Sequence, residues 1–176
     1  MIDMKKNKLM ILGASILQLP AIEQAMSMGL SVVALDMNSE AVGFSVPGVT
    51  KEVISTIDIG AVIEAAKRHR VDGIMTLATD MPMRTVAAVA TECGLIGISK
   101  DTAVKATDKA EMREALKKAG VPIPRFYKVR NTDEFREAMH KMPDAFMVKP
   151  ADSSGRWRLK KPMSMQKNIA KTVMLS

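Results

Sequence analysis

The feature that most constrains the fold is an alternation of short apolar runs with helical patterns in the first half of the chain. The apolar runs have the length and composition of strands buried on both faces; they are residues 8–12, 31–36, 52–56 and 72–78. Helical patterns follow the first, third and fourth runs, at residues 16–28, 58–70 and 83–94. Such strands, joined by right-handed crossovers, predict a doubly wound, Rossmann-like α/β unit with a parallel sheet.

The pattern changes after residue 94, where "GISKDTAVKAT" is predicted as a helical connector. Asp108 is placed to cap the next helix, Glu111 to complete a capping box, and Gly120 to end it. The prolines of "VPIP" then interrupt the chain. A second, α+β segment is predicted beyond them, with a strand at 125–129, a helix at 132–142 and a strand at 145–149.

The net charge of +7 is concentrated at the end of the chain. Six of the 26 basic residues lie in residues 156–176, which contain no acid. The rest of the chain is close to neutral, so its charge gives no reason to predict nucleic acid as a partner.

Cys93 is the one cysteine, which excludes an intrachain disulfide and fits a reducing compartment. The N-terminal lysines and apolar run are similar to a secretory signal, but Asp3 and Gly13 interrupt that pattern. No run reaches the roughly 18 apolar residues of a membrane helix. We therefore predict a soluble, cytoplasmic protein without a membrane partner.

The first turn, "GASILQLPA", has two interpretations. One is a dinucleotide fingerprint, with Asp36 at the end of the second strand facing an NAD ribose. However, Ser15 and Gln18 stand where that fingerprint has glycines. The other is a tight strand-to-helix turn with an exposed aspartate.

Thr79 and Asp80 follow the fourth predicted strand. Ligands of open parallel sheets bind outside the carboxyl ends of strands, so both residues are candidates for contact with a small polar substrate. The alternative is that one of them caps the helix that starts near Pro82.

Two lysines are candidates for binding phosphate. Lys109 lies in the first turn of its helix, where a cation opposes the helix dipole unless an anion is nearby. Lys149 ends an apolar strand and precedes the small-residue loop "ADSSG". Such a lysine offers a point charge, and such a loop offers backbone N–H groups, to phosphate oxygens. A surface lysine and an ordinary turn are the alternatives.

The order of these segments resembles the N-terminal part of the ATP-grasp ligases, which include carboxylate–amine ligases, biotin carboxylases and carbamoyl-phosphate synthase large subunits. The resemblance covers residues 8–155. It rests on "KLMILGAS", "VVALDMN", "DGIMTLATDMP", "GLIGIS", "ATDKAEMREALKKAGVPIP" and "FMVKPADSSG".

The resemblance implies ATP as the nucleotide, held by Lys109, Lys149 and a flexible loop that begins at Ser153, Ser154 and Gly155. It also implies a pre-ATP-grasp domain over residues 1–100 that contributes to the substrate site. We expect a small carboxylate and an amine as substrates, and a homodimer or other self-association. The residues expected at the substrate site are Gly13, Ala14, Ser15, Asp36, Thr79 and Asp80.

The resemblance further implies a connector over residues 101–120 and an incomplete lid over residues 121–155. No Asp or Glu follows Gly155, so the Mg²⁺ ligands of the family are absent, and His69 and His140 have no neighbours at metal-ligand spacing. We predict no metal site, assign no catalytic residue and expect an inactive chain. Residues 156–176 are interpreted as a frameshifted or otherwise aberrant tail. A neighbouring reading frame of the gene should then resume lid-like sequence.

Two other function classes stay open. One is an NAD-dependent oxidoreductase built on the first unit. The other is a non-enzymatic module whose basic tail binds nucleic acid or another anion, with an affinity that falls steeply with salt.

Overall fold

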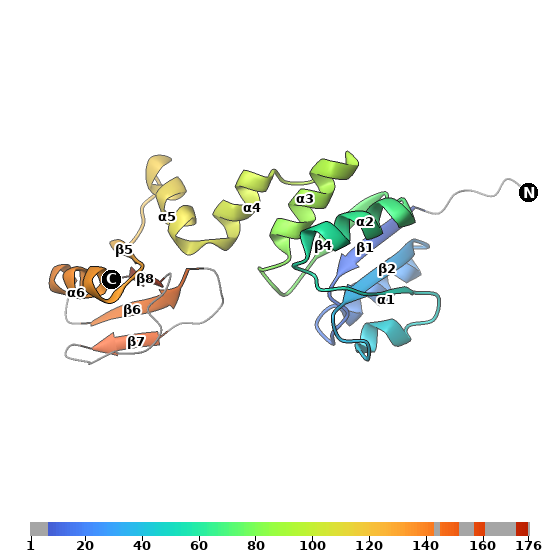
Figure 1. Ribbon diagram of the computed structural model, residues 1–176, viewed down its shortest axis with the longest axis horizontal. Coiled ribbons are helices and arrows are strands. Elements are labelled where there is room, and N and C mark those ends of the chain that lie inside the picture. The colour runs from blue at the N-terminus through green and yellow to red at the C-terminus, as the bar shows by residue number, and fades with distance from the viewer. Residues whose placement is uncertain (1–6, 143–144, 152–156, 161–171, 176) are drawn as a thin grey trace, which may run out of the picture. The chain divides into compact units, whose positions relative to one another are not determined.

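The computed structural model describes residues 7–142, 145–151, 157–160 and 172–175. The chain divides into two compact units, residues 1–103 and 104–176. Unit 1 contains a parallel sheet and unit 2 an antiparallel one (Figure 1). The predicted α/β class, with a Rossmann-like unit followed by a smaller α+β unit, is confirmed. The finer division at residues 100, 120 and 155 stays a prediction.

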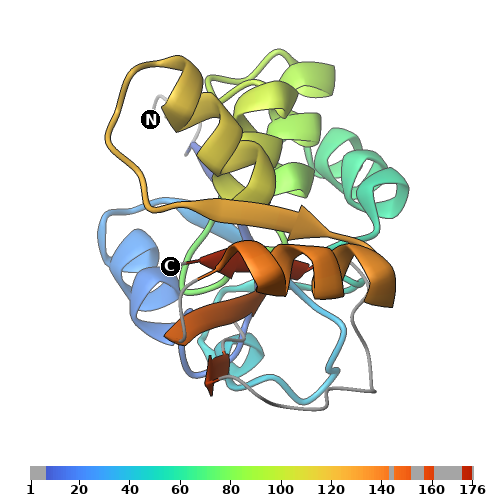
Figure 2. The same cartoon turned by 90° about the vertical axis from the view of Figure 1, so that its left-hand side faces the viewer.

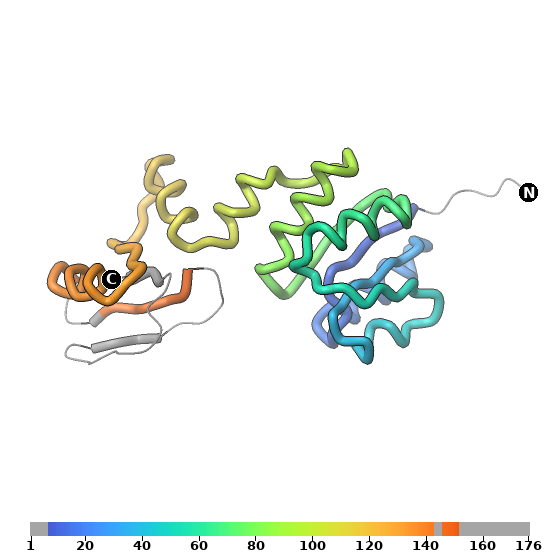
Figure 3. Tube along the Cα trace, viewed as in Figure 1, coloured from blue at the N-terminus to red at the C-terminus, as the bar shows by residue number. Residues whose placement is uncertain are grey.

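Unit 1 follows the predicted alternation of strand and helix (Figure 3). Its strands are β1 (Lys8–Leu12), β2 (Ser31–Asp36), β3 (Thr50–Val53) and β4 (Gly73–Thr76). Its helices are α1 (Leu19–Ser27), the 3-10 helix η1 (Val42–Ser45), α2 (Ile59–His69) and α3 (Met83–Cys93). Helix α4 (Lys100–Thr107) contains the boundary between the units. The sheet order is β3-β2-β1-β4, so the chain reverses direction across the sheet between β1 and β4.

Helices cover both faces of this sheet, because alternate residues of each strand point to opposite sides. One face packs against α2 and α3 through Met10, Leu12, Val33 and Leu35. The other face packs against α1 through Ile11, Val32 and Ala34. Burial on both sides explains why these strands are continuously apolar.

Three element boundaries in unit 1 differ from the predicted ones. Helix α1 begins at Leu19 and not near Ile16, because the side chains of Ser15 and Gln18 fold the preceding residues into a separate turn. Strand β3 begins two residues earlier than predicted, since Thr50 pairs with Val33, and it ends at Val53. Strand β4 ends early, before Ala78 turns the chain with a positive φ of 60°.

Unit 2 contains helices α5 (Lys109–Lys118) and α6 (Thr132–Lys141). Its strands are β5 (Phe126–Val129), β6 (Ala145–Pro150), β7 (Trp157–Lys160) and β8 (Thr172–Leu175). They form a sheet in the order β5-β8-β6-β7. Helix α6 covers one face of it (Figure 2) and buries Phe135 and Ala138 against Phe146 and Val148 of β6.

Strand β6 places its side chains alternately on the two faces. Phe146 and Val148 pack on α6, whereas Met147 packs with Ala110 of α5 and Ala151. By the same alternation, Lys149 lies on the face of Met147.

The N-terminus of α5 confirms one half of the predicted capping box. The Asp108 carboxylate accepts hydrogen bonds from the N–H groups of Ala110 and Glu111. Glu111 was wrongly expected to bond the Asp108 N–H, which instead donates to Val104 O at 2.8 Å. The Glu111 carboxylate accepts from Lys128 Nζ at 2.9 Å and ties α5 to β5.

Two strands that were not predicted, β7 and β8, lie beyond residue 155. Strand β7 pairs with β6, and β8 pairs with both β5 and β6. "WRLK" alternates apolar and basic residues and "TVML" contains β-branched residues, which are both local strand signals.

Candidate functional site

A pocket of about 270 Å³ lies at the carboxyl ends of the unit 1 strands. Residues that follow all four strands line it. They are Gly13, Ser15, Leu17 and Gln18 after β1, Asp36 and Met37 around the end of β2, Thr56 after β3, and Ala78, Thr79, Met81 and Pro82 after β4. The pocket therefore includes the point between β1 and β4 where the strand order reverses, which is where open α/β sheets bind ligands.

Asp36 organises one wall of the pocket. Its Oδ2 accepts the Ala14 N–H at 2.9 Å, and its Oδ1 accepts the Asn38 N–H at 2.9 Å. The carboxylate is half-buried, not exposed as the tight-turn interpretation expected. Asp36 thus connects the β1 turn to the β2 turn while keeping its negative charge at the pocket wall.

Gln18 organises another part of the pocket wall and is only 3% exposed. Its Oε1 accepts from both the N–H and the hydroxyl of Ser15, and its Nε2 donates to Leu77 O at 2.8 Å. The Gln18 side chain also fills the space above Gly13, where an added Cβ would lie 2.8 Å from its Cδ. One buried amide therefore joins the turns after β1 and β4.

The β4 turn carries Thr79 and Asp80. Neither caps α3 as the alternative interpretation expected, because α3 starts at Met83 with Pro82 at its N-cap and no side-chain cap. Thr79 lines the pocket, whereas Asp80 is exposed in the same turn. Ala78 has a left-handed backbone that costs a non-glycine residue about 1–2 kcal/mol.

The structure brings four of the six predicted substrate residues to this pocket: Gly13, Ser15, Asp36 and Thr79. Ala14 is fully buried behind it and contributes its N–H to Asp36. Four further lining residues were not predicted: Leu17, Met37, Thr56 and Met81. Gln18 stood out in the sequence only as a departure from a glycine pattern. The strand-end rule that selected Thr79 would also have selected Thr56.

The two lysines predicted to bind phosphate belong to unit 2. The Lys109 N–H donates to Ala151 O at 2.8 Å, which joins the first turn of α5 to the end of β6. Lys149 precedes Ala151 by two residues, on the strand face that packs toward α5. Both lysines are half-buried. Ser153, Ser154 and Gly155 lie outside the described residues.

The backbone at the start of α5 is already used within the protein. The Asp108 carboxylate occupies the N–H groups of Ala110 and Glu111, and Ala151 occupies that of Lys109. A phosphate held here would therefore contact the lysine side chains rather than the helix N-terminus.

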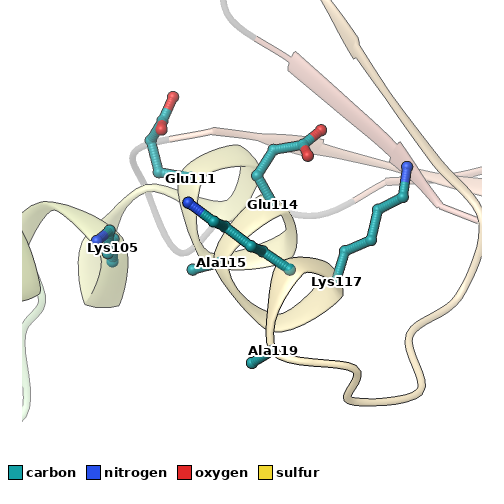
Figure 4. A pocket seen from close by; sticks show the side chains of 7 residues that line it. Lys105, Glu111, Glu114, Ala115, Lys117 and Ala119 are labelled. Atoms are coloured by element: carbon teal, nitrogen blue, oxygen red, sulfur yellow. The ribbon is translucent and has the colours of Figure 1, made fainter.

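A larger hollow of about 770 Å³ lies along α5 in unit 2. Figure 4 shows Glu111, Glu114 and Lys117 extending from α5, with Lys105 on the preceding helix. None of the residues predicted to bind a ligand lines it. Its charged side chains of both signs are typical of a solvated helix face.

The described part of the chain shows neither a metal-ligand cluster nor a membrane-spanning helix. No group of three or more His, Cys, Asp or Glu side chains there could hold a metal ion. No helix among the described residues has the length and apolar character needed to cross a membrane.

No protein-family model matches the chain, and no curated protein matches its sequence. Solved structures do match its fold. N5-carboxyaminoimidazole ribonucleotide synthetase from Thermotoga maritima matches over 96% of this chain with a TM-score of 0.77 and 20% identity. The Staphylococcus aureus synthetase of that name, complexed with ADP, matches over 96% with a TM-score of 0.79 and 17% identity. The L-amino acid ligase from Bacillus licheniformis matches over 89% with a TM-score of 0.73 and 22% identity.

The fold is that of the N-terminal part of ATP-grasp ligases. The chain spans 45%, 47% and 40% of the lengths of the three matched proteins. The 96% coverage of this chain is more than residues 1–155 could supply, so the ATP-grasp match extends beyond Gly155. A closer likeness to biotin carboxylase or carbamoyl-phosphate synthase stays a prediction.

Proposed function

We propose that this chain is part of an ATP-dependent ligase that joins a small carboxylate to an amine. The γ-phosphoryl group of ATP would pass to the carboxylate oxygen with release of ADP. The amine would then attack the acyl phosphate, forming a C–N bond and expelling phosphate. In this proposal unit 1 binds a substrate and unit 2 contributes the first phosphate contacts, in the cytoplasm.

The observation that carries the proposal is the hydrogen bond from Lys109 N–H to Ala151 O. It fixes the turn that carries Lys109 to the end of the strand that carries Lys149. Two half-buried ammonium groups on adjoining elements can together neutralise a polyphosphate, and such charge-assisted contacts are stronger than neutral ones. The likeness to a synthetase solved with ADP supports the same assignment.

The turn after β1 argues against the alternative of an NAD-dependent oxidoreductase. Its N–H groups donate within the protein, from Gly13 to Leu35 O, from Ala14 to Asp36 and from Ser15 to Gln18. A pyrophosphate on this turn would need those donors. The Gln18 side chain also occupies the space that a glycine would leave open.

Titration of ATP into the 176-residue chain, followed by calorimetry, tests the proposal. We expect weak binding of ATP and ADP and none of NADH. Lys149→Ala and Lys109→Ala should each reduce ATP affinity about tenfold, the loss of one charge-assisted contact. Lys141→Ala is the matched control, because Lys141 pairs with Glu137 at 2.5 Å on α6, and this variant should bind ATP normally.

Unchanged ATP affinity in the Lys149→Ala variant would refute the phosphate role. Binding of NADH in preference to ATP would overturn the ligase assignment as a whole.

A further inference from the structure

The pocket of unit 1 has an electrostatic character that restricts its ligand. Asp36 is the one charged side chain among the described residues that line it, and no Lys or Arg is in that set. The matched structure from Thermotoga maritima is an N5-carboxyaminoimidazole ribonucleotide synthetase, and a ribonucleotide carries a phosphate. A phosphate in this pocket would face a carboxylate without a side-chain cation to balance it.

The backbone donors of the turn after β1 do not replace the missing cation. The N–H groups of Gly13, Ala14, Ser15 and Leu17 donate to Leu35 O, Asp36 Oδ2, Gln18 Oε1 and Ser15 Oγ, respectively. An anion at this helix N-terminus would have to compete with these internal acceptors. The N–H groups of this turn are therefore not available to bind an anion, as those of a helix N-terminus often do.

The groups that remain available suit a different ligand. The hydroxyls of Thr56 and Thr79 line the pocket and make no hydrogen bond within the described part of the chain. Each carboxylate oxygen of Asp36 accepts one backbone N–H and has capacity for a second donor. An ammonium group could use that capacity, because it brings only donors and a positive charge.

The rim of the pocket is apolar. Leu17, Met37 and Met81 line it and are 58%, 75% and 41% exposed. Methionine adapts its shape to varied apolar ligands, and burial of these side chains by a ligand would be favourable. The volume of about 270 Å³ is near the lower limit of ligand sites, so the ligand is small.

We propose that the pocket binds a small primary amine with an apolar side chain and rejects phosphorylated compounds. Its ammonium group lies at Asp36, and its apolar part lies against Leu17, Met37 and Met81. The inference deepens the proposed function and rests on it only for the role of this amine as the nucleophile of the ligation.

Binding measured by NMR on the full chain tests the inference with four probes. They are 3-methylbutylamine, its neutral analogue 3-methylbutanol, its anionic analogue 4-methylpentanoate, and ribose 5-phosphate. We expect the amine to bind tightest, the alcohol more weakly, and the two anions not at all, with shifts confined to the turns after the unit 1 strands.

Thr79→Lys sharpens the test, since it adds a cation at an exposed position of the pocket. This variant should lose amine affinity about tenfold and gain binding of ribose 5-phosphate. Ser39→Lys adds the same charge at an exposed residue outside the pocket lining and should change neither. Far-UV circular dichroism establishes that both variants fold.

Tighter binding of ribose 5-phosphate than of the amine by the unchanged chain would overturn the inference, as would equal binding of the amine and the alcohol. An ATP titration of the same sample separates the two proposals. Amine binding without ATP binding would leave this inference standing and refute the proposed function.

Discussion

The two units position their candidate binding residues by different means. In unit 1, the half-buried side chain of Asp36 and the buried side chain of Gln18 hold the turns around the pocket through hydrogen bonds to distant backbone groups. In unit 2, the main chain places Lys109 and Lys149 through a helix start, a strand and one backbone hydrogen bond. The pocket therefore depends on a few polar side chains, whereas the position of the lysines depends on secondary structure.

The largest expected effect is on the side-chain network of unit 1. Asp36→Ala should lower the free energy of unfolding by about 2–3 kcal/mol, because the N–H groups of Ala14 and Asn38 both lose their acceptor. Urea denaturation measures the loss. Asp80→Ala is the control, since that exposed carboxylate lies in a neighbouring turn, and it should change stability by less than about 0.5 kcal/mol. Equal losses in the two variants would contradict the assigned role of Asp36.

Next in size is the ion pair that joins β3 to α2 in unit 1. Burial pushes the pKa of Glu52 up, but hydrogen bonds from His69 and Arg68, at 2.5 and 2.6 Å, outweigh it and hold the pKa below its ordinary 4.5. A lowered pKa means that the carboxylate adds stability above pH 4.5 and loses that stability as the pH falls through the folded-state pKa.

Glu52→Gln should therefore cost about 1–2 kcal/mol at pH 7, and the difference from the unchanged chain should shrink as the pH falls below 4.5. Urea denaturation at a series of pH values measures both. Glu137→Gln is the unit 2 counterpart: the hydrogen bond from Lys141 lowers the pKa of Glu137, but this pair is exposed. The change in stability should be smaller there. A pH-independent loss in Glu52→Gln would refute the assignment.

A smaller effect is expected at the start of α5 in unit 2. Asp108→Ala removes a cap that accepts two backbone N–H groups and should cost about 1 kcal/mol. Asp108→Asn should retain most of that stability, because asparagine caps about as well as aspartate. Hydrogen exchange of the first turn of α5 would report the loss directly. Protection that is unchanged in the alanine variant would show that the backbone bond to Ala151 suffices.

The smallest effect concerns the strained turn after β4. Ala78→Gly should raise the free energy of unfolding by about 0.5 kcal/mol, because glycine adopts the positive φ of 60° without the Cβ clash. Ala119→Gly at the end of α5 is the matched change in unit 2, where the φ of −82° suits alanine. That variant should lose about 0.5 kcal/mol or more. Thermal unfolding distinguishes the two signs, and stabilisation of both variants would contradict the strain assigned to Ala78.

Much of the fold could be predicted because its signals are local. The apolar runs of β1 and β2 and the cap of α5 at Asp108 each act over a few residues. The placement of Thr79 near Asp36 followed from one general rule about parallel strands. These features could be predicted without knowing which side chains contact each other in the folded protein.

The remaining features depend on contacts between residues far apart in the chain. The Gln18 amide donates to Leu77 O, 59 residues away in the chain. The residues next to Gln18 in the sequence therefore gave no sign that its side chain would join the turns after β1 and β4. The Glu111 carboxylate was expected to accept from the Asp108 N–H. It accepts from Lys128 instead, because α5 packs on β5 and brings that lysine within reach. The alternation of apolar strands with helices along the chain was enough to predict the fold class and to predict which edge of the sheet carries the pocket. The polar lining of that pocket was decided only when packing brought the turns together, because a buried polar group must find its partner wherever the folded chain supplies one.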